Sequence, residues 1–352
     1  MKKFLLLVFS SLVLIIIIMG VYAYSLYQRP GVRYILNMSG YMEPSNFVKS
    51  EETLRVDGTQ IPVMKYTRPQ GPSDKWFILI HGFAPSAHEH PRINQMAASI
   101  CDATGMSVLI PRVPAFFQEN KDVQPIIDNI RTVYLALTKE FSGQYRAFGA
   151  CLGGTFLLMA LQDVPVDIYP EKILLFGPMN DGKWLQEKMN QNNQQLDFIV
   201  KLAITGNHDA FSSAEKKLIH KAMMSSSPGK TDTTKMKQIL GTSLYNDISI
   251  LNIDDSFFSD FRESIPPGSI NQEARCRYFI LHSHNDDIIP FSEGKSLFHY
   301  MKEQGKNVRF YGTETTGHTD STVTVTGLYQ EMKYLTNFFD SLFEGDVIPR
   351  TQ

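Results

Sequence analysis

Cysteine is scarce in this 352-residue sequence, which contains only Cys101, Cys151 and Cys276. An odd number of cysteines cannot all pair within one chain, and these three are too scattered for a disulfide framework or a zinc site. The sequence therefore implies no metal ion. No motif that would bind a cofactor is present, so none is expected.

The sequence also lacks any concentration of charge of one sign. The formal net charge is −2, and there is no long basic block. Proteins that bind nucleic acids gather Lys and Arg on one face, so we expect no nucleic-acid partner. A hydrophobic content of 43% and a charged content of 20% are typical of a globular protein that buries a sizeable core.

Only one long hydrophobic run occurs, from Phe4 to Tyr24, directly after two lysines. Spanning the hydrocarbon core of a bilayer takes about 20 residues, whereas the apolar part of a secretory signal has about 7–15. We therefore expect an N-terminal signal anchor, a single transmembrane helix, within residues 1–27. The small residues Val21 and Ala23 are placed as a cleavage site requires, so a cleaved signal peptide is the alternative.

The charges that flank this run bear on its orientation. Lys2 and Lys3 favour a cytoplasmic N-terminus, although Arg29 and Arg33 beyond the other end weaken that bias. We accordingly expect a single-pass membrane protein whose body lies on the non-cytoplasmic side. Cleavage would instead give a secreted or periplasmic protein.

Beyond the run, short apolar segments alternate with helical ones. Residues 53–67 are predicted to form a hairpin around Asp57-Gly58. The alternation indicates βαβ units and a mostly parallel, doubly wound α/β sheet with helices on both faces. The predicted strands are 76–80, 107–110, 145–148, 172–176, 278–281 and 308–311, and the predicted helices are 92–103, 123–140, 152–162, 293–304 and 327–343.

One interval, residues 179–276, interrupts the alternation and is rich in Asn, Gln, Lys, Met and Ser. We interpret it as a helical cap inserted over the C-terminal edge of the sheet; a helical elaboration at the side of the fold is the alternative. The predicted organisation is thus an anchor (1–27), a connector (28–52), a core in two parts (53–178 and 277–345) and the inserted cap.

The segment Gly-Ala-Cys-Leu-Gly-Gly, residues 149–154, lies between a predicted strand and a predicted helix. A nucleophile at the tip of such a tight turn needs very small neighbours two residues before and after it, and Gly149 and Gly153 supply them. The following helix points its N-terminus at Cys151, which favours a thiolate. We therefore predict that Cys151 is a nucleophile. A glycine-rich junction around a buried structural cysteine is the alternative.

Another predicted strand is followed by His81, Gly82 and Phe83. The backbone N–H groups of Phe83 and Leu152 are the expected donors of an oxyanion hole, in which each donor contributes roughly 10²–10³ in rate. His81 is expected to shape the loop rather than to take part in the chemistry.

Two further candidates follow the strands near the C-terminus. Asp286 lies after the strand 278–281 and is preferred as the acid over the neighbouring Asp287, while His318 precedes the final helix. The chain order is then nucleophile, acid, base. In this hypothesis His318 takes the thiol proton of Cys151, and Asp286 orients the imidazole and stabilises its charge.

The motifs HGF, GACLGG, DDIIP and GH, in this order, resemble the α/β-hydrolase superfamily over roughly residues 53–343. The GxCxGG elbow is similar to that of dienelactone hydrolases, which use a Cys-His-Asp triad but are small, soluble and without a large cap. It is also similar to polyhydroxyalkanoate synthases, in which a Thr often follows the elbow, as Thr155 does here; those enzymes generally lack an HG-type loop.

These features together predict an enzyme that cleaves an ester or thioester of a small, hydrophobic acyl substrate through an acyl-enzyme. Two other functions are compatible with the sequence: an acyltransferase, and a membrane-anchored binding protein without turnover. The sequence does not indicate the acyl group, the leaving group or the oligomeric state.

Overall fold

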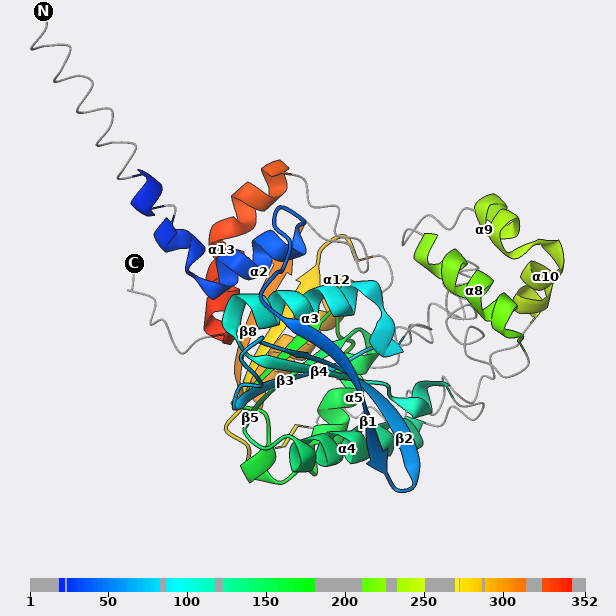
Figure 1. Cartoon of the computed structure of the whole chain (residues 1–352), viewed down its shortest axis with the longest axis horizontal. Helices are drawn as coiled ribbons and strands as arrows, with labels where there is room; N and C mark the ends of the chain where they lie inside the picture. Colours follow the sequence, from blue (N-terminus) through cyan, green and yellow to red (C-terminus); the bar gives the residue numbers. More distant parts are fainter. Residues whose placement is uncertain are drawn as a thin grey trace, which may run out of the picture.

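The computed structural model describes residues 19–22, 24–82, 87–117, 123–180, 211–225, 233–250, 270–271, 273–286, 289–314 and 325–343 (Figure 1). They contain one eight-stranded sheet with the order β1-β2-β4-β3-β5-β6-β7-β8. Its strands are β1 (Val48–Val56), β2 (Thr59–Thr67), β3 (Lys75–Ile80), β4 (Ser107–Pro111), β5 (Gln144–Ala150), β6 (Lys172–Phe176), β7 (Arg277–Ser283) and β8 (Asn307–Thr313).

The sheet is mostly parallel, as predicted. Strands β4, β3, β5, β6, β7 and β8 run parallel to one another, and only the β1–β2 and β2–β4 pairs are antiparallel. Asp57 and Gly58 connect β1 and β2 with φ values of 47° and 82°, which is the backbone of the tight turn that Asp-Gly favours. Since the parallel strands share a direction, their C-terminal ends lie at one edge of the sheet.

Helices cover both faces of the sheet (Figure 1). The residues of α4, α5 and α12 pack on one face, and those of α2, α3 and α13 on the other. The described helices are α2 (Pro30–Met38), α3 (Pro91–Thr104), α4 (Val123–Glu140), α5 (Leu152–Leu161), α8 (Ser213–Ser225), α9 (Thr233–Leu240), α10 (Thr242–Ile250), α12 (Phe291–Glu303) and α13 (Val325–Phe343).

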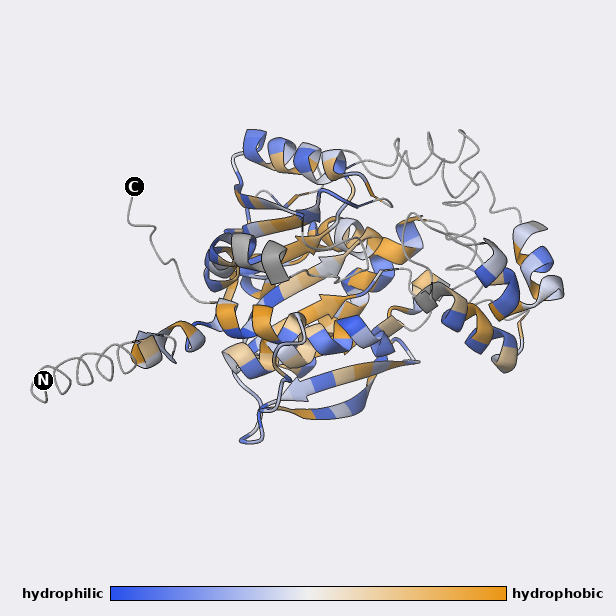
Figure 2. Cartoon of the chain, turned by 90° about the horizontal axis from the view of Figure 1, so that it is seen from above, coloured by the Kyte–Doolittle hydropathy of each residue, from blue (hydrophilic) through white to orange (hydrophobic). Residues whose placement is uncertain are grey.

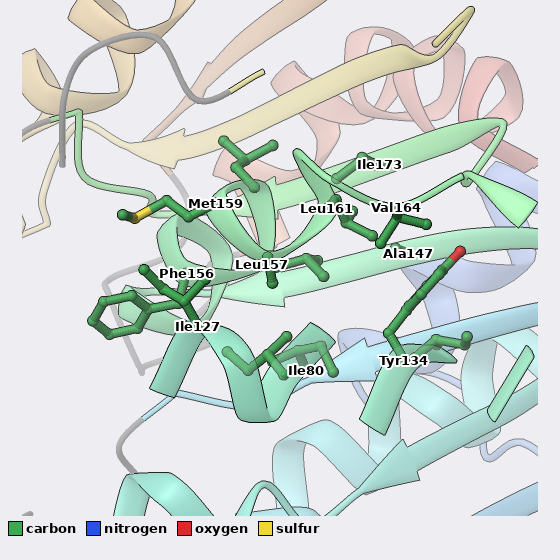
Figure 3. Packing of buried hydrophobic residues seen from close by; sticks show 14 of the residues in the cluster. Ile80, Ile127, Tyr134, Ala147, Phe156, Leu157, Met159, Leu161, Val164 and Ile173 are labelled. Carbon is green, nitrogen blue, oxygen red and sulfur yellow. The ribbon is translucent and has the colours of Figure 1, made fainter. Parts of the chain in front are cut away.

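Strand β3 illustrates why the central strands read as continuous apolar runs. Trp76, Ile78 and Ile80 belong to the core under α4 and α5, whereas Phe77 and Leu79 belong to the core under α3 and α13. Successive side chains of a strand point to opposite faces, so a strand covered on both sides needs apolar residues at every position. Figure 3 shows the first of these cores, in which Ile80 from β3 and Ala147 from β5 lie opposite residues of α4 and α5.

The end of α13 is attached to the beginning of the central strands. Arg146 near the start of β5 donates from Nη1 to the carbonyl oxygen of Phe343 at 2.5 Å. Lys172, the first residue of β6, donates from Nζ to the carbonyl oxygen of Ser341 at 2.7 Å. Both side chains are buried. Cations beside the last carbonyl groups of a helix stabilise its C-terminus, and here they place that terminus at the N-terminal edge of the sheet.

The segment interpreted as a connector, residues 28–52, contains helix α2 and the first residues of β1. Tyr34 and Ile35 of α2 are buried among side chains of α3 and α13. This helix could not be predicted, because nine residues do not hold a helix by themselves and most of its stability comes from packing against its neighbours.

Helices α8, α9 and α10 lie between β6 and β7 in the chain, inside the interval 179–276. They enclose a small core of their own, made of Ile219, Ala222, Met236, Leu240, Leu244 and Ile248. Both views place these helices at one end of the molecule, opposite the N-terminal segment (Figures 1 and 2). The remainder of the interval from 181 to 269 lies outside the described residues.

The predicted anchor, residues 1–27, also falls largely outside the described residues. Among the residues that are described, no helix is long and apolar enough to cross a membrane. Residues 19–22 and 24–27 are described and are helical. Of these, Met19, Val21, Tyr22 and Tyr24 are each about two-thirds exposed.

Candidate functional site

Cys151 occupies the single position between β5 and α5, with φ 53° and ψ −133°. A positive φ is unusual for a residue other than glycine and costs of order 1–3 kcal/mol, so the surrounding structure must enforce it. The amide of Cys151 donates to the carbonyl oxygen of Phe176 at the end of β6 at 2.8 Å. The strand–turn–helix arrangement expected from the sequence is therefore present, with the cysteine at its tip.

The glycines around Cys151 are required by close backbone approaches. A Cβ atom on Gly149 would lie 2.3 Å from the Cα of Gly154, and one on Gly153 would lie 2.2 Å from the carbonyl oxygen of His81. Any larger residue at either position would force the backbone apart. A Cβ on Gly82 would lie 3.2 Å from the carbonyl oxygen of Ala150 and 3.5 Å from the Cβ of Cys151, so the end of β3 also lies directly against the turn.

Cys151 differs from the other two cysteines in its exposure. Cys101 and Cys276 are buried, whereas Cys151 is partly exposed, and all three are free thiols. Burial raises the pKa of Cys101 to about 11, and it raises the pKa of Cys276 further still. A raised pKa disfavours the thiolate, which is the nucleophilic form, so Cys101 and Cys276 are poor nucleophiles. Cys151 is the cysteine that solvent can reach.

Only one of the two expected oxyanion donors, Leu152, lies within the described residues. Leu152 is the first residue of α5, and the first N–H groups of a helix have no acceptor within the helix. Phe83 lies outside the described residues, but the preceding residue, Gly82, lies beside Cys151. The chain thus passes the cysteine where the second donor is predicted.

Asp286 follows the end of β7 and is buried. Its Oδ1 accepts a hydrogen bond from the amide of Ile289 at 2.8 Å, and its Oδ2 lies 3.4 Å from Nε2 of His282. The competing Asp287 lies outside the described residues. Asp286 is therefore a fixed carboxylate at the same edge of the sheet as Cys151.

Sequence reasoning missed His282, which lies inside β7 and is fully buried. Its Nε2 is 2.8 Å from the carbonyl oxygen of Ile289, so this nitrogen carries the proton. Glycine at 294 is needed because a Cβ there would lie 2.3 Å from the ring Nδ1. A lone histidine within an apolar strand is the signal that could have pointed to a special role for this position.

The predicted base, His318, lies outside the described residues, but Glu314 and Val325, which flank the segment 315–324, are described. The segment begins after β8, whose Gly312 and Thr313 pair with His282 and Ser283 of β7. Asn285, next to Asp286, donates from Nδ2 to the carbonyl oxygen of Glu314 at 3.2 Å. The chain that leads to His318 therefore starts beside the loop that carries Asp286.

Glu331 of α13 fixes this starting point and was also missed from the sequence. Its Oε2 accepts from the hydroxyl of Thr313 and its Oε1 from the amide of Glu314, each at 2.7 Å. A single glutamate on a helix surface normally indicates only a solvated face, so no sequence pattern distinguishes it.

His81 has the loop-shaping contacts expected for it. Its Nδ1 lies 2.7 Å from the carbonyl oxygen of Gly82 and therefore donates, while Nε2 accepts from the amide of Val113 at 3.1 Å. Complete burial lowers the pKa of His81 to about 3, and nearby cationic groups such as Arg112 lower it as well. His81 is thus held neutral and ties the end of β3 to the residues after β4.

No group of three or more His, Cys, Asp and Glu side chains suited to holding a metal ion occurs within the part of the chain that the structure describes. The arrangement around Cys151 can instead present a nucleophile, helix N–H donors and a buried carboxylate along one edge of the sheet.

No model of a protein family matches this sequence, and no curated protein matches it. Solved structures do resemble its fold. An esterase from the archaeon Pyrobaculum calidifontis has 10% identity over 92% of this chain and 94% of that chain, with a TM-score of 0.53. A thermostable esterase from Pseudomonas putida has 12% identity over 89% of this chain and 90% of that chain, with a TM-score of 0.50.

The chain also matches the Pyrococcus horikoshii acylaminoacyl peptidase, at 12% identity and a TM-score of 0.49, but spans only 43% of that protein's length. Together with the strand order, the likeness to the esterases shows that this chain has the α/β-hydrolase fold.

Proposed function

We propose that the protein is a membrane-anchored hydrolase that cleaves an ester or thioester through a covalent acyl-enzyme on Cys151. The strained backbone of Cys151 is the observation that carries this proposal. Strain of this kind persists only where the surrounding structure enforces it, and it concentrates at functional sites. A structural cysteine would need neither the positive φ nor the two glycines that permit it.

The proposed reaction begins when His318 takes the proton of the Cys151 thiol. The sulfur attacks the acyl carbon, and the carbonyl oxygen gains negative charge next to the N–H groups of Phe83 and Leu152. The bond to the leaving alcohol or thiol then breaks, and His318 protonates that leaving group. Water attacks the resulting thioester with His318 as the base, which releases the acid and restores the thiol.

Asp286 has the properties that the third member of such a triad needs. Its carboxylate is buried and is fixed at Oδ1 by the amide of Ile289. A buried carboxylate of this kind holds an imidazole in one tautomer and stabilises the imidazolium that forms during the reaction.

The inserted helices α8–α10 support a cap in the proposed enzyme. They leave the core after β6, at the edge where Cys151 and Asp286 lie, and the chain returns at the opposite edge, where β7 begins beside the start of β6. Thr155 on α5 fixes the first of these ends through two hydrogen bonds with the backbone of Met179, each at 3.1 Å. An apolar acyl group held between cap and core fits this layout.

Membrane anchoring is supported by the apolar run from Phe4 to Tyr24 and by the exposed apolar side chains of its described part. The two leading lysines favour a body on the non-cytoplasmic side.

An acyl-directed activity probe for serine and cysteine hydrolases tests the proposal. Wild-type protein and the control Cys276→Ala should be labelled, whereas Cys151→Ala and His318→Ala should lose labelling. Equal labelling of the wild type and Cys151→Ala would contradict the proposal. Product analysis then separates hydrolysis from transfer, since a hydrolase releases the free acid even when an alcohol acceptor is added.

A further inference from the structure

Helix α2 joins the body at the edge of the sheet that lies opposite Cys151. Its partners are Asp340, near the C-terminus of α13, and Asp102, near the C-terminus of α3. The end of α13 is held at the beginning of β5 and β6 by Arg146 and Lys172, and α3 ends three residues before β4 begins. Both contacts therefore lie toward the N-terminal edge of the sheet.

The contact with Asp340 fixes the start of α2. Oδ2 of this buried aspartate accepts from Nε of Arg29 and Oδ1 accepts from the amide of Gly31, both at 2.7 Å. A second nitrogen of Arg29 donates to Oδ1 of Asn337 at 2.9 Å. A Cβ on Gly31 would lie 2.6 Å from the carbonyl oxygen of Thr336, so α2 approaches α13 as closely as backbones allow.

The contact with Asp102 fixes the rest of α2. Oδ2 of Asp102 accepts from Arg33 at 3.1 Å and from Nδ2 of Asn37 at 2.9 Å. The ring of Tyr34 packs against that of Phe339, with their centroids 4.5 Å apart. Buried charges that are paired on several sides hold one geometry, and breaking such a set is costly. The chain that leaves the membrane anchor is thus joined directly to the body.

The segment that precedes α2 leaves the body at this end. Residues 19–22 and 24–27 extend outward with exposed apolar and aromatic side chains, and they continue the apolar run that begins at Phe4. Both views show this segment at the opposite end of the molecule from α8–α10 (Figures 1 and 2). Tyr side chains next to Arg are typical of the interface between membrane and water.

We propose that the end of the body formed by α2 and the C-terminal half of α13 faces the lipid bilayer, and that the Cys151 site opens away from it. This inference rests on the anchor in the proposed function. A strand of 5–7 residues spans roughly 20 Å, which separates the two edges of the sheet. The acyl substrate therefore reaches Cys151 from the aqueous side and not from the bilayer that holds the enzyme.

The inference can be tested with full-length protein in protein-free lipid vesicles whose headgroups carry a short-range fluorescence quencher. One fluorophore is attached to Asn307→Cys, an exposed residue at the start of β8 on the N-terminal edge of the sheet, in a Cys151→Ala background, and another to Cys151 of the wild type. The label at 307 should be quenched several-fold more strongly than the label at 151. A label on Lys217→Cys in α8 gives a second reporter of the far end. Equal or reversed quenching would overturn the inference.

Variants of the contact between Arg29 and Asp340 test whether it sets this orientation. Asp340→Ala should bring the quenching at the two labels closer together, while the matched control Asp128→Ala on α4 should leave the difference unchanged. If Asp340→Ala does not fold, Arg29→Gln removes the same contact from its more exposed side. An unchanged difference in a folded variant would contradict the proposed role of α2.

The outcomes also separate this inference from the proposed function. If the protein does not stay with the vesicles, the anchor and the orientation are refuted together, because the orientation depends on the anchor. Probe labelling of Cys151 in a parallel sample of wild-type protein without fluorophore would still support the hydrolase. Loss of labelling with the quenching pattern intact would refute only the enzyme.

Discussion

Nε2 of His282 lies 3.4 Å from Oδ2 of Asp286, and both side chains are buried under the loop that follows β7. The proton on Nε2 points to the carbonyl oxygen of Ile289 at 2.8 Å, and the amide of Ile289 in turn donates to Oδ1 of Asp286. Histidine, loop backbone and carboxylate thus form one connected set. The position of the proposed acid depends on a residue four places earlier in the chain.

Replacing His282 tests that dependence. His282→Phe keeps an aromatic ring but leaves the carbonyl of Ile289 without its donor, which should lower the free energy of unfolding by about 1–3 kcal/mol. It should also slow acylation of Cys151 because Asp286 is less well positioned. His282→Gln, which can still donate, should recover part of both. Urea unfolding and rates of probe labelling measure the two effects, and a fully stable and active His282→Phe would refute the account.

Gly153 and Gly82 give a graded test of the turn around Cys151. A Cβ on Gly153 meets the carbonyl oxygen of His81 at 2.2 Å, whereas one on Gly82 meets the carbonyl oxygen of Ala150 at 3.2 Å. Gly153→Ala should therefore destabilise the protein by about 3 kcal/mol or more and abolish labelling, while Gly82→Ala should cost clearly less. Thermal unfolding of the two variants side by side checks the order, and the reverse order would be inconsistent with this geometry.

The buried His81 should make stability fall in acid. Burial lowers the pKa of His81 in the folded protein to about 3, from an ordinary value of 6.5. As the pH drops below 6.5 the unfolded chain takes up a proton that the folded protein refuses, so folding loses about 2 kcal/mol by pH 5. His81→Gln should show a shallower loss between pH 7 and pH 5. Parallel slopes for wild type and variant in urea titrations would exclude this role.

Thr155 tests the attachment of the inserted interval. Its hydroxyl both donates to and accepts from the backbone of Met179. Thr155→Val keeps the shape but leaves two buried backbone groups unpaired, which should cost about 1–3 kcal/mol, whereas Thr155→Ser keeps the bonds. Proteolysis between α5 and α8 should become faster in Thr155→Val alone. If both variants are cleaved at the wild-type rate, the attachment does not depend on this hydroxyl.

Much of the fold could be predicted because its signals are local. The strand predicted at 172–176 is β6 to the residue, and the helix predicted at 123–140 is α4. A continuous apolar run of strand length, or apolar residues at helical spacing, indicates its own structure. The glycines around Cys151 likewise predicted the tight turn, because their spacing is visible within six residues of sequence, although Gly153 meets the backbone of the distant His81.

Features that depend on distant partners could not be predicted. Helix α2 is stabilised by Asp102 and Asp340, which lie far away in the sequence. The roles of His282 and Glu331 depend on the loops that follow β7 and β8. Local sequence carries no information about such contacts. Phe83 and His318 lie outside the described residues, and their roles stay predictions.

The central claim is that Cys151 carries the acyl group during turnover. Mass spectrometry of the intact protein, quenched soon after mixing with a panel of aryl esters and thioesters, tests it most directly. The account predicts that the wild type gains the mass of one acyl group, mapped to Cys151, and that Cys151→Ala gains none. Turnover in Cys151→Ala at the wild-type rate, with no adduct in either protein, would contradict it.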